Sequence, residues 1–332
     1  MTAGGSHGGT EARRSPAARW LRAGLAGIAF LPVIGLALAA IAPTGWWLPC
    51  LAMHWAPQLA LLCLPFWCWR GRGWKVGLGM LLLAAASLWP SLLAAFAPQA
   101  PAPAGGIVVT TANIYFRSER HAEAIARLDG DLVALIETRA EDHALVMADP
   151  RWPHQHWQRS RKVAGMALLS AFPMRAKGIE LDRCYGIDAR VEMPWGTQRV
   201  IVLHTWSPTT PEHNAGNHRQ LAELAGLAET EPGPLLVMGD LNATPGTPGM
   251  RLLRATGLRP PHGGEVRTWP SQLGPFGIAI DHVLARGLAL GEASSIDLPG
   301  SDHHAVRVRV AGGAAGTGRQ DATRAPTATP PP

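Results

Sequence analysis

Polar side chains with chemically useful groups stand at the ends of apolar runs in the C-terminal two thirds of this 332-residue chain. They are Asn113 after VVTTA, Glu137 after LVALI, His204 after VIVL, Asp240 and Asn242 in GDLN after LLVM, Asp281 within IAIDHVL, and Asp302 and His303 shortly before AVRVRV. Carboxylate and amide oxygens are the hard ligands that a divalent cation accepts, and an imidazole can transfer a proton near neutral pH. Because ligand sites in α/β domains are usually built at strand ends, these residues are candidates for one site.

Each of these residues also has a structural explanation when it is taken singly. A glutamate at a strand end is usually a solvated boundary, and Gly-Asp-Leu-Asn at 239–242 suits a turn whose side chains bond local backbone groups. Ser-Asp-His at 301–303 suits a loop with a surface histidine. Asp281 is different, because an unpaired carboxylate in the core of a strand is costly. It requires a partner, and a histidine is the expected one.

The elements that must position these residues follow from the spacing of apolar side chains. Short apolar runs predict buried strands at 107–111, 131–136, 165–170, 199–204, 235–239, 278–285 and 305–310. Helical spacing predicts helices at 118–128, 141–147 and 213–230. This alternation indicates a mixed α/β domain of about 200 residues.

Three apolar stretches precede that domain, at 20–41, 46–69 and 74–96. Each has about the 20 residues that a helix needs to cross a bilayer, and tryptophans cluster near their ends. A signal peptide would provide one shorter stretch, so we expect three transmembrane helices. His54 and Gln58 are polar residues in the second stretch, for which we expect helix–helix hydrogen bonds, with the lining of a pathway as the alternative.

Basic residues are placed asymmetrically around these stretches. Three arginines precede the first one and a fourth, Arg22, lies at its start. Two arginines separate the second from the third, at whose start Lys75 lies, and the connection at 42–45 is uncharged. The positive-inside rule then places the N-terminus in the cytoplasm and the α/β domain on the outer, periplasmic side of a bacterial inner membrane. The expected organisation is a disordered cytoplasmic leader over 1–18, three transmembrane helices over 19–97, a Pro/Ala/Gly linker over 98–106, the α/β domain over 107–311 and a disordered tail over 312–332.

The basic character of the chain comes from its flanks. The chain has 30 Lys and Arg residues against 24 Asp and Glu residues. Nine of the basic and two of the acidic residues lie outside 105–312, which leaves 21 basic against 22 acidic groups in the α/β domain. The domain is therefore nearly neutral, and its charge gives no support to a nucleic-acid-binding face.

Taken together and in this order, the polar residues resemble a known pattern, that of the endonuclease/exonuclease/phosphatase superfamily with its DNase I-like fold. The resemblance rests on Asn113 and Glu137 at strand ends, His204, Gly-Asp-Leu-Asn at 239–242, Asp281 before a histidine, and Ser-Asp-His at 301–303. The three apolar stretches also resemble a membrane-anchored bacterial subgroup. The resemblance implies a four-layer α/β/β/α sandwich preceded by three transmembrane helices.

The resemblance further implies a phosphoesterase that depends on a divalent metal, Mg²⁺ or Mn²⁺. Its expected metal residues are Asn113, Glu137 and Asp302, and its expected catalytic residues are His204, Asp240, Asn242, Asp281 and His303. Asp281 would orient His303, Asn242 would donate to the phosphate, and His204 would bind a phosphoryl oxygen or support the leaving group. The pattern leaves both Asp240 and His303 open as the acid or base.

The sequence leaves the substrate and two further contacts as hypotheses. Trp206 offers a stacking face, and Arg219 is a candidate phosphate contact. The expected substrate is a phosphodiester such as a nucleic acid, although a neutral domain disfavours strong non-specific DNA binding, and a nearby bilayer keeps a lipid headgroup open. A catalytically inactive, membrane-tethered binding module is the alternative of another class, against which the complete set of acids and histidines speaks. No obligate protein partner is expected for this membrane-integral chain.

Overall fold

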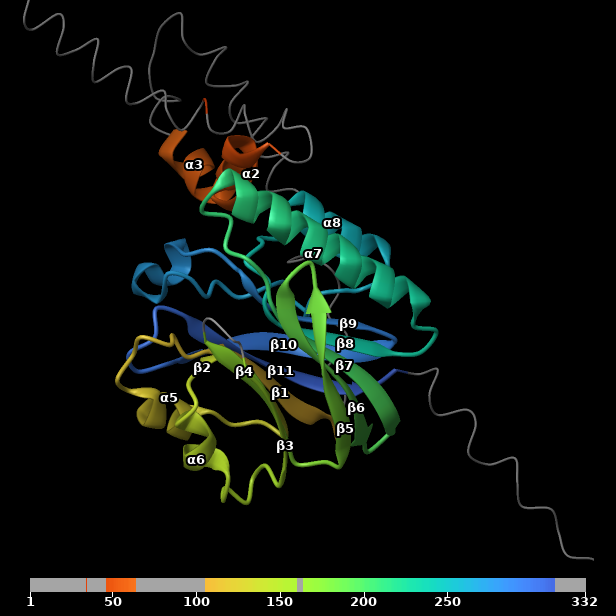
Figure 1. Ribbon diagram of the computed structural model, residues 1–332. Coiled ribbons are helices and arrows are strands. Elements are labelled where there is room, and N and C mark those ends of the chain that lie inside the picture. Colours follow the sequence, from red (N-terminus) through yellow and green to blue (C-terminus); the bar gives the residue numbers. More distant parts are fainter. Residues whose placement is uncertain (1–33, 35–45, 64–104, 160–163, 314–332) are drawn as a thin grey trace, which may run out of the picture.

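The computed structural model describes residues 46–63, 105–159 and 164–313 and, of the rest of the chain, Ile34 alone. The expected leader, the first and third transmembrane helices, most of the linker and most of the tail lie outside the described residues. In the described part, two β-sheets pack face to face and helices cover both outer faces (Figure 1). The predicted α/β/β/α sandwich of the DNase I-like type is therefore confirmed.

The first sheet has six strands in the order β10-β11-β1-β2-β4-β3. Their bounds are β1 (Ile107–Asn113), β2 (Leu132–Thr138), β3 (His154–Gln158), β4 (Gly165–Ser170), β10 (Leu288–Asp297) and β11 (His304–Gly312). β1 and β2 run parallel, with Asn113 opposite Ile136, while β1 pairs antiparallel with β11. Asn113 and Glu137 therefore leave the sheet at the same edge, because the carboxyl ends of parallel neighbours meet there.

The second sheet has five strands in the order β5-β6-β7-β8-β9. Their bounds are β5 (Met174–Leu181), β6 (Cys184–Met193), β7 (Gly196–His204), β8 (Leu235–Asp240) and β9 (Asp281–Arg286). β7 is parallel to β8 with His204 opposite Asp240, and β9 is antiparallel to β8 with Asp281 opposite Asp240. Three of the predicted site residues thus lie in one row across the sheet.

Strand β2 shows why continuous apolar runs form the centre of this fold. Its side chains alternate between the two faces of the sheet. Leu132 and Ile136 belong to the core between the sheets, whereas Val133 and Leu135 belong to the core under the helices of the outer layer. Both faces are buried, so the strand reads as an unbroken apolar run.

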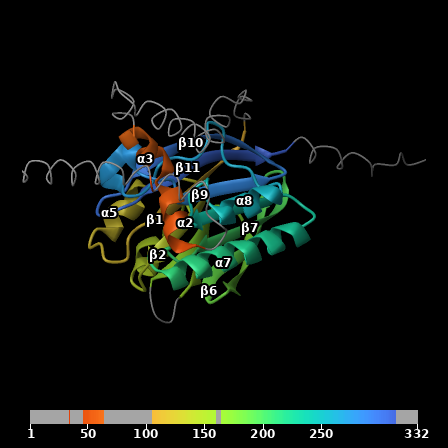
Figure 2. The same cartoon turned by 90° about the horizontal axis from the view of Figure 1, so that it is seen from above.

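Helices cover the outer face of each sheet. The first sheet is covered by α5 (His121–Arg127) and α6 (Asp142–Val146), and the second by α7 (Pro211–Thr230) and α8 (Pro248–Ala255) (Figures 1 and 2). α7 begins where the sequence provides a cap and a helix-starting proline. The Thr210 side chain accepts a hydrogen bond from the His213 backbone N–H, and Pro211 occupies the first turn, where it loses no helical hydrogen bond. This places α7 against the strands that end in His204 and Asp240.

The described part of the second apolar stretch differs from the expected single helix. It forms two eight-residue helices, α2 (Trp47–His54) and α3 (Ala56–Cys63), which are separated at Trp55. Pro57 explains the break, because its ring clashes with the carbonyl four residues earlier and it has no backbone N–H to donate. No helix among the described residues combines the length and the apolar composition that crossing a membrane requires.

Candidate active site

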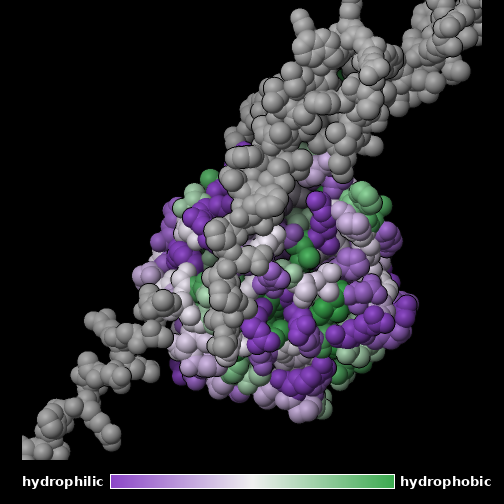
Figure 3. All heavy atoms as spheres, turned by 180° about the vertical axis from the view of Figure 1, so that it is seen from behind, coloured by the Kyte–Doolittle hydropathy of each residue, from purple (hydrophilic) through white to green (hydrophobic). Residues whose placement is uncertain are grey.

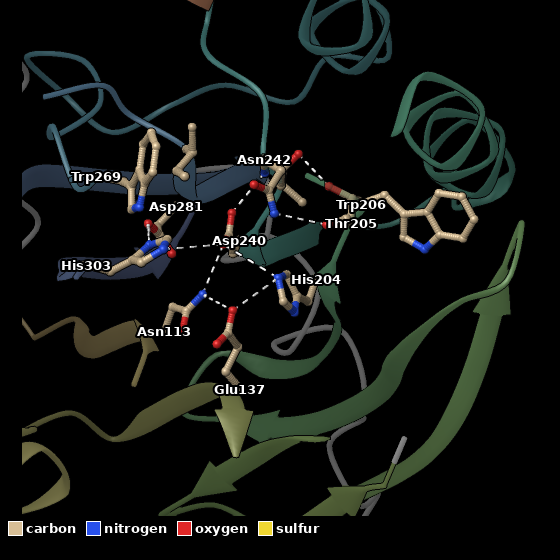
Figure 4. A network of polar contacts seen from close by, with 12 residues as sticks. Asn113, Glu137, His204, Thr205, Trp206, Asp240, Asn242, Trp269, Asp281 and His303 are labelled. Carbon is tan, nitrogen blue, oxygen red and sulfur yellow. Dashed lines mark hydrogen bonds and ion pairs between the residues drawn. The ribbon is translucent and has the colours of Figure 1, made fainter. Parts of the chain in front are cut away.

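Side chains from both sheets meet at the edge where β1, β2, β7 and β8 end (Figure 4). The Asn113 side-chain amide donates to Glu137 Oε1 and to Asp240 Oδ2, both at 3.1 Å. His204 Nε2 lies 3.8 Å from Glu137 Oε1 and 3.7 Å from Asp240 Oδ2. Asn113 and Glu137 belong to the first sheet and the other two residues to the second, so the cluster spans the seam between the sheets.

A buried histidine–aspartate pair stands beside this cluster. His303 Nδ1 lies 2.8 Å from Asp281 Oδ2, while its Nε2 lies 3.9 Å from Asp240 Oδ2 and 4.0 Å from Asp302 Oδ1. Ser301 secures the segment, because its hydroxyl donates to the Asn113 carbonyl and accepts from the His303 backbone N–H. The second ring nitrogen, Nε2, is therefore directed at the carboxylates of Asp240 and Asp302.

The charges around His303 keep its imidazole protonated. Burial opposes the positive charge, but the carboxylate of Asp281, with Asp240 and Asp302 behind it, outweighs burial and raises the pKa of His303 to about 10. At neutral pH both ring nitrogens then carry protons, and Nε2 is a donor.

Asp240 carries its negative charge in a buried position, which raises the pKa of its carboxyl group. Its removal from water, and then the carboxylate of Asp281, raise the pKa of Asp240 to about 6, although the two imidazoles oppose this shift. The backbone N–H of Asn242 donates to Asp240 Oδ1 at 2.9 Å and fixes the carboxylate. Asp240 is therefore ionised at neutral pH but is a better proton acceptor than an ordinary aspartate.

The backbone is strained at two residues of the site. Glu137 has φ of 63° and Asn242 has φ of 45°, in the left-handed region that residues other than glycine seldom adopt. Glu137 is held by the Asn113 amide and by the Phe116 backbone N–H, which donates to Oε2 at 3.0 Å. Strain of this kind is concentrated at functional sites, where the surrounding structure maintains it.

The donor set of the site fits a hard divalent cation. Ligand atoms of Asp240, Asp281 and His303 all lie within 4.8 Å of one another, and of these the carboxylate oxygens can bind a cation, whereas a protonated imidazole cannot. Asp281 Oδ1 and Asp302 Oδ1 are buried oxygens without a hydrogen-bond partner in the structure. A buried carboxylate oxygen is stabilised by a cation, and carboxylates are the ligands that Mg²⁺ and Mn²⁺ prefer.

Two residues predicted to contact substrate lie outside this cluster. Arg219 Nε donates to Asp182 Oδ2 at 2.9 Å, at the turn between β5 and β6. The Trp206 ring points away from the carboxylates in Figure 4 and packs against α7, where a Cβ on Gly216 would approach it to 2.6 Å. Both side chains have a structural explanation in the packing of α7, so no contact of theirs supports the prediction.

Sequence reasoning missed the residues that hold the Gly-Asp-Leu-Asn loop. The Asn217 amide on α7 lies 2.9 Å from Thr205 Oγ1 and 3.0 Å from the Leu241 carbonyl, and the Thr205 hydroxyl also donates to that carbonyl. The amide of Asn242, predicted to donate to phosphate, gives one hydrogen bond to the Thr205 carbonyl at 3.0 Å. The available signal was an asparagine on the apolar, buried face of a helix, because such a group needs polar partners.

A carboxylate cluster with a histidine–aspartate pair, carried on an α/β/β/α sandwich, defines the class of phosphoric ester hydrolases. A family model described as the Endonuclease/Exonuclease/phosphatase family matches residues 110–303, more than half of the chain. The chain belongs to this family.

Solved structures show the same fold. The chain is similar to an endonuclease/exonuclease/phosphatase from Beutenbergia cavernae DSM 12333, with 18% identity, a TM-score of 0.52, and coverage of 63% of this chain and 72% of that one. It is also similar to a D. rerio TDP2 humanized by 14 mutations, with 14% identity, a TM-score of 0.52, and coverage of 61% and 98%. A protein from Enterococcus faecalis V583 aligns with 17% identity, a TM-score of 0.51, and coverage of 62% and 99%. The search of curated proteins found no match.

Proposed function

We propose that this chain is a phosphodiesterase that requires Mg²⁺ or Mn²⁺ and cleaves a phosphodiester, most favourably in a nucleic acid. The observation that carries the proposal is the placing of a protonated His303, oriented by Asp281, opposite the ionised Asp240 across the cluster. An acid and a base with separated pKa values are what proton transfer at neutral pH needs.

Glu137 and Asp302 would hold the cation, with Asn113 bracing the carboxylate of Glu137. A bound divalent cation supplies neutralisation of charge on the phosphoryl oxygens. The Asp302 oxygen that lacks a partner is available for this role. Asn113 acts through its amide hydrogens, because its Oδ1 already accepts from the Tyr115 backbone N–H at 3.0 Å.

The remaining side chains divide the proton transfers. Asp240 accepts the proton of the attacking water, because it is the ionised group with a raised pKa. His303 donates from Nε2 to a phosphoryl oxygen or to the leaving oxygen, because it carries the proton at neutral pH. His204 has an exposed fraction of 26% for its side chain and lies at the open side of the cluster, where it can contact the phosphate.

A lipid headgroup is the second candidate substrate, and one observation favours it. The apolar helices α2 and α3 dock on the domain close to the site, where Trp55 packs edge-on against Trp269, with ring centroids 6.3 Å apart. Trp46, directly before α2, and Leu48, within α2, are 62% and 58% exposed. An exposed apolar surface of this kind suits contact with a bilayer.

The placing of the domain belongs to the same proposal. We propose that the first apolar stretch, 20–41, spans a bacterial inner membrane and leaves the domain on the outer side, supported by its length and by the arginines at its N-terminal end. The second stretch is not proposed as a span, because α2 and α3 contact the domain and so lie on the same side of the membrane as the domain. A C-terminal alkaline phosphatase fusion should be active in cells. Activity from a cytoplasmic reporter alone would reverse the orientation.

The test of the activity is hydrolysis of bis(p-nitrophenyl) phosphate by the full chain in detergent, with and without EDTA. We expect metal-dependent turnover that falls by about 10²- to 10⁴-fold in Glu137→Ala and His303→Ala. Glu229→Ala, which removes an exposed carboxylate of α7, is the matched control and should retain full activity. Equal rates in the wild type and all three variants would refute the proposal. Single-stranded DNA, double-stranded DNA and phospholipid vesicles then separate the two substrate classes.

A further inference from the structure

The segment that contains α2 and α3 is attached to the catalytic domain by specific contacts. The Trp47 indole N–H donates to the Pro208 carbonyl at 2.9 Å, just before α7 begins. The Gln58 side-chain amide donates to the carbonyls of Phe276 and Gly277 at 2.9 and 2.7 Å. Figures 1 and 2 both place α2 beside the N-terminal end of α7. The segment therefore has a defined position on the domain, which a passive membrane anchor does not need.

The part of the domain that α3 contacts has little support from the core. The 3₁₀ helix η2 (Ser271–Phe276) has no buried residue. Two backbone hydrogen bonds close the loop at its base, because the N–H of Trp269 donates to the carbonyl of Ile278 and the N–H of Ile278 donates to the carbonyl of Trp269. Beyond that base, the Gln58 amide holds the two carbonyls at the end of η2, so α3 provides polar support that the core does not.

The same loop begins at a residue that fixes a carboxylate of the site. The Trp269 indole N–H donates to Asp302 Oδ2 at 3.1 Å, and the Ser271 backbone N–H donates to the Asp302 carbonyl at 2.7 Å. With Oδ2 occupied, Oδ1 is the oxygen that faces the site, 4.0 Å from His303 Nε2. The Trp269 indole therefore holds the Asp302 carboxylate by one of its two oxygens.

Trp55, at the break between α2 and α3, contacts that ring, with ring centroids 6.3 Å apart. The two indoles meet at an angle of 60° between their planes, in the edge-to-face arrangement that aromatic pairs prefer. The chain of contacts thus runs from Trp55 to Trp269 and on to Asp302. Trp55 is more than 200 positions away from both residues in the sequence.

We propose that Trp55 is a positioning residue of the active site, because its indole sets the ring of Trp269 and thereby the carboxylate of Asp302. The N-terminal segment is then a working part of the catalytic unit, and its displacement lowers metal affinity without unfolding the domain. This inference rests on the proposed function only in assigning Asp302 to the cation.

The test measures Mn²⁺ binding by electron paramagnetic resonance on the full chain in detergent, beside thermal unfolding. We expect Trp55→Ala to weaken Mn²⁺ binding by about three- to tenfold, from the contribution of one aromatic pair. Trp55→Phe should restore most of the affinity. Leu51→Ala, at an exposed position of the same helix α2, is the matched control and should bind as the wild type does.

A second variant separates positioning from a general loss of structure. Trp269→Phe keeps an aromatic ring but removes the N–H that holds Asp302. If Trp55 acts through Trp269, the double variant should bind Mn²⁺ as weakly as Trp269→Phe alone, because coupled residues are not additive. Unchanged affinity in Trp55→Ala, or additive losses in the double variant, would overturn the inference. A wild-type chain that binds Mn²⁺ but hydrolyses no phosphodiester would instead refute the proposed function alone.

Discussion

Glu137 is a residue of the site whose backbone conformation is strained. Its φ of 63° places an L-residue in the left-handed region, which costs about 1–2 kcal/mol. In this backbone conformation the carboxylate accepts a hydrogen bond from the Asn113 amide on the neighbouring strand. The strain and the charge can be separated by substitution.

We predict that Glu137→Gly is more stable than Glu137→Ala by about 1 kcal/mol, while both are inactive. Glycine adopts this φ without strain, whereas alanine keeps the strain and loses the carboxylate. Urea unfolding of both variants measures the difference. Equal stabilities would show that the observed φ carries no strain.

His121 makes the free energy of unfolding depend on pH. Its Nδ1 lies 2.8 Å from Asp142 Oδ2, and its Nε2 lies 3.0 Å from the Tyr115 carbonyl. Both nitrogens face acceptors, so the imidazole must be protonated to satisfy both. Burial lowers the pKa of His121, but the hydrogen bonds to Asp142 and Tyr115 more than compensate, and the pKa is raised.

Because the folded-state pKa of His121 lies above its unfolded value, its ionic contribution to stability is complete below the unfolded value of about 6.5. It is lost as the pH rises through the folded-state pKa. We predict that His121→Gln lowers the free energy of unfolding by about 3 kcal/mol at pH 6 and by clearly less at alkaline pH. Denaturant unfolding at pH 6 and pH 9 checks this, and a pH-independent loss would contradict it.

At the scale of elements, the parallel pairing of β7 with β8 depends on a glycine. Gly239 has φ of 134°, and a Cβ at this position would lie 2.0 Å from the Leu203 carbonyl oxygen. The close approach brings Asp240 into register with His204 on the neighbouring strand. A side chain at 239 would therefore push apart the two strands that carry the site.

We predict that Gly239→Ala lowers the free energy of unfolding by about 2–4 kcal/mol. The activity should fall as well, because less protein is folded and because Asp240 is displaced from His204 in the protein that does fold. Gly226→Ala is the matched control, since Gly226 lies on α7 with open space around it. That change should stabilise the chain by about 0.5–1 kcal/mol. Similar effects of the two substitutions on thermal unfolding would contradict the role of Gly239.

The elements that sequence reasoning identified were those with one simple pattern. The runs that form β2 and β8 are buried on both faces, and the amphipathic spacing in α7 is regular. β5 and β6 were missed, because their alternating side chains do not form an apolar run. The turn between them uses Asp182 and Arg183 at positive φ, and an arginine is not a typical residue there.

The candidate site was predictable for a related reason. Its residues follow buried strands, and the ends of parallel neighbours meet in space, which groups Asn113 with Glu137 and His204 with Asp240. The two pairs lie in different sheets, so joining them into one site depended on the family resemblance. Trp206 could not be placed, because strand position alone does not show which way the chain turns beyond His204. Gly216 decided this from the facing helix by leaving room for the ring.

At the scale of the whole molecule, charge is the property that the sequence describes most directly. The 21 basic and 22 acidic residues of 105–312 nearly cancel. The face opposite to that in Figure 1 shows hydrophilic residues interspersed with small hydrophobic patches among the coloured atoms (Figure 3). A surface of this composition offers few concentrated contacts for a phosphate backbone.

We predict a shallow salt dependence for any nucleic-acid substrate. The logarithm of the dissociation constant for a single-stranded oligonucleotide should change with the logarithm of salt concentration with a slope of about 2 or less, which corresponds to about three phosphate contacts or fewer. Fluorescence anisotropy with the Asp240→Asn variant, which should bind without cleaving, measures this slope. A slope of 6 or more would reveal an extended basic surface that the net charge conceals.

The position of β11 has a consequence for when the enzyme becomes active during its synthesis. β11 is the last strand of the described chain, yet it pairs with β1, the first strand of the domain, and the Ser301–His303 segment directly precedes it. A nascent chain released only as far as β9 already has Asn113, Glu137 and Asp240, but it has no His303 to donate a proton. We therefore expect phosphoric ester hydrolysis to begin only after the final strand has left the ribosome and closed the first sheet, so that unfinished chains have no activity.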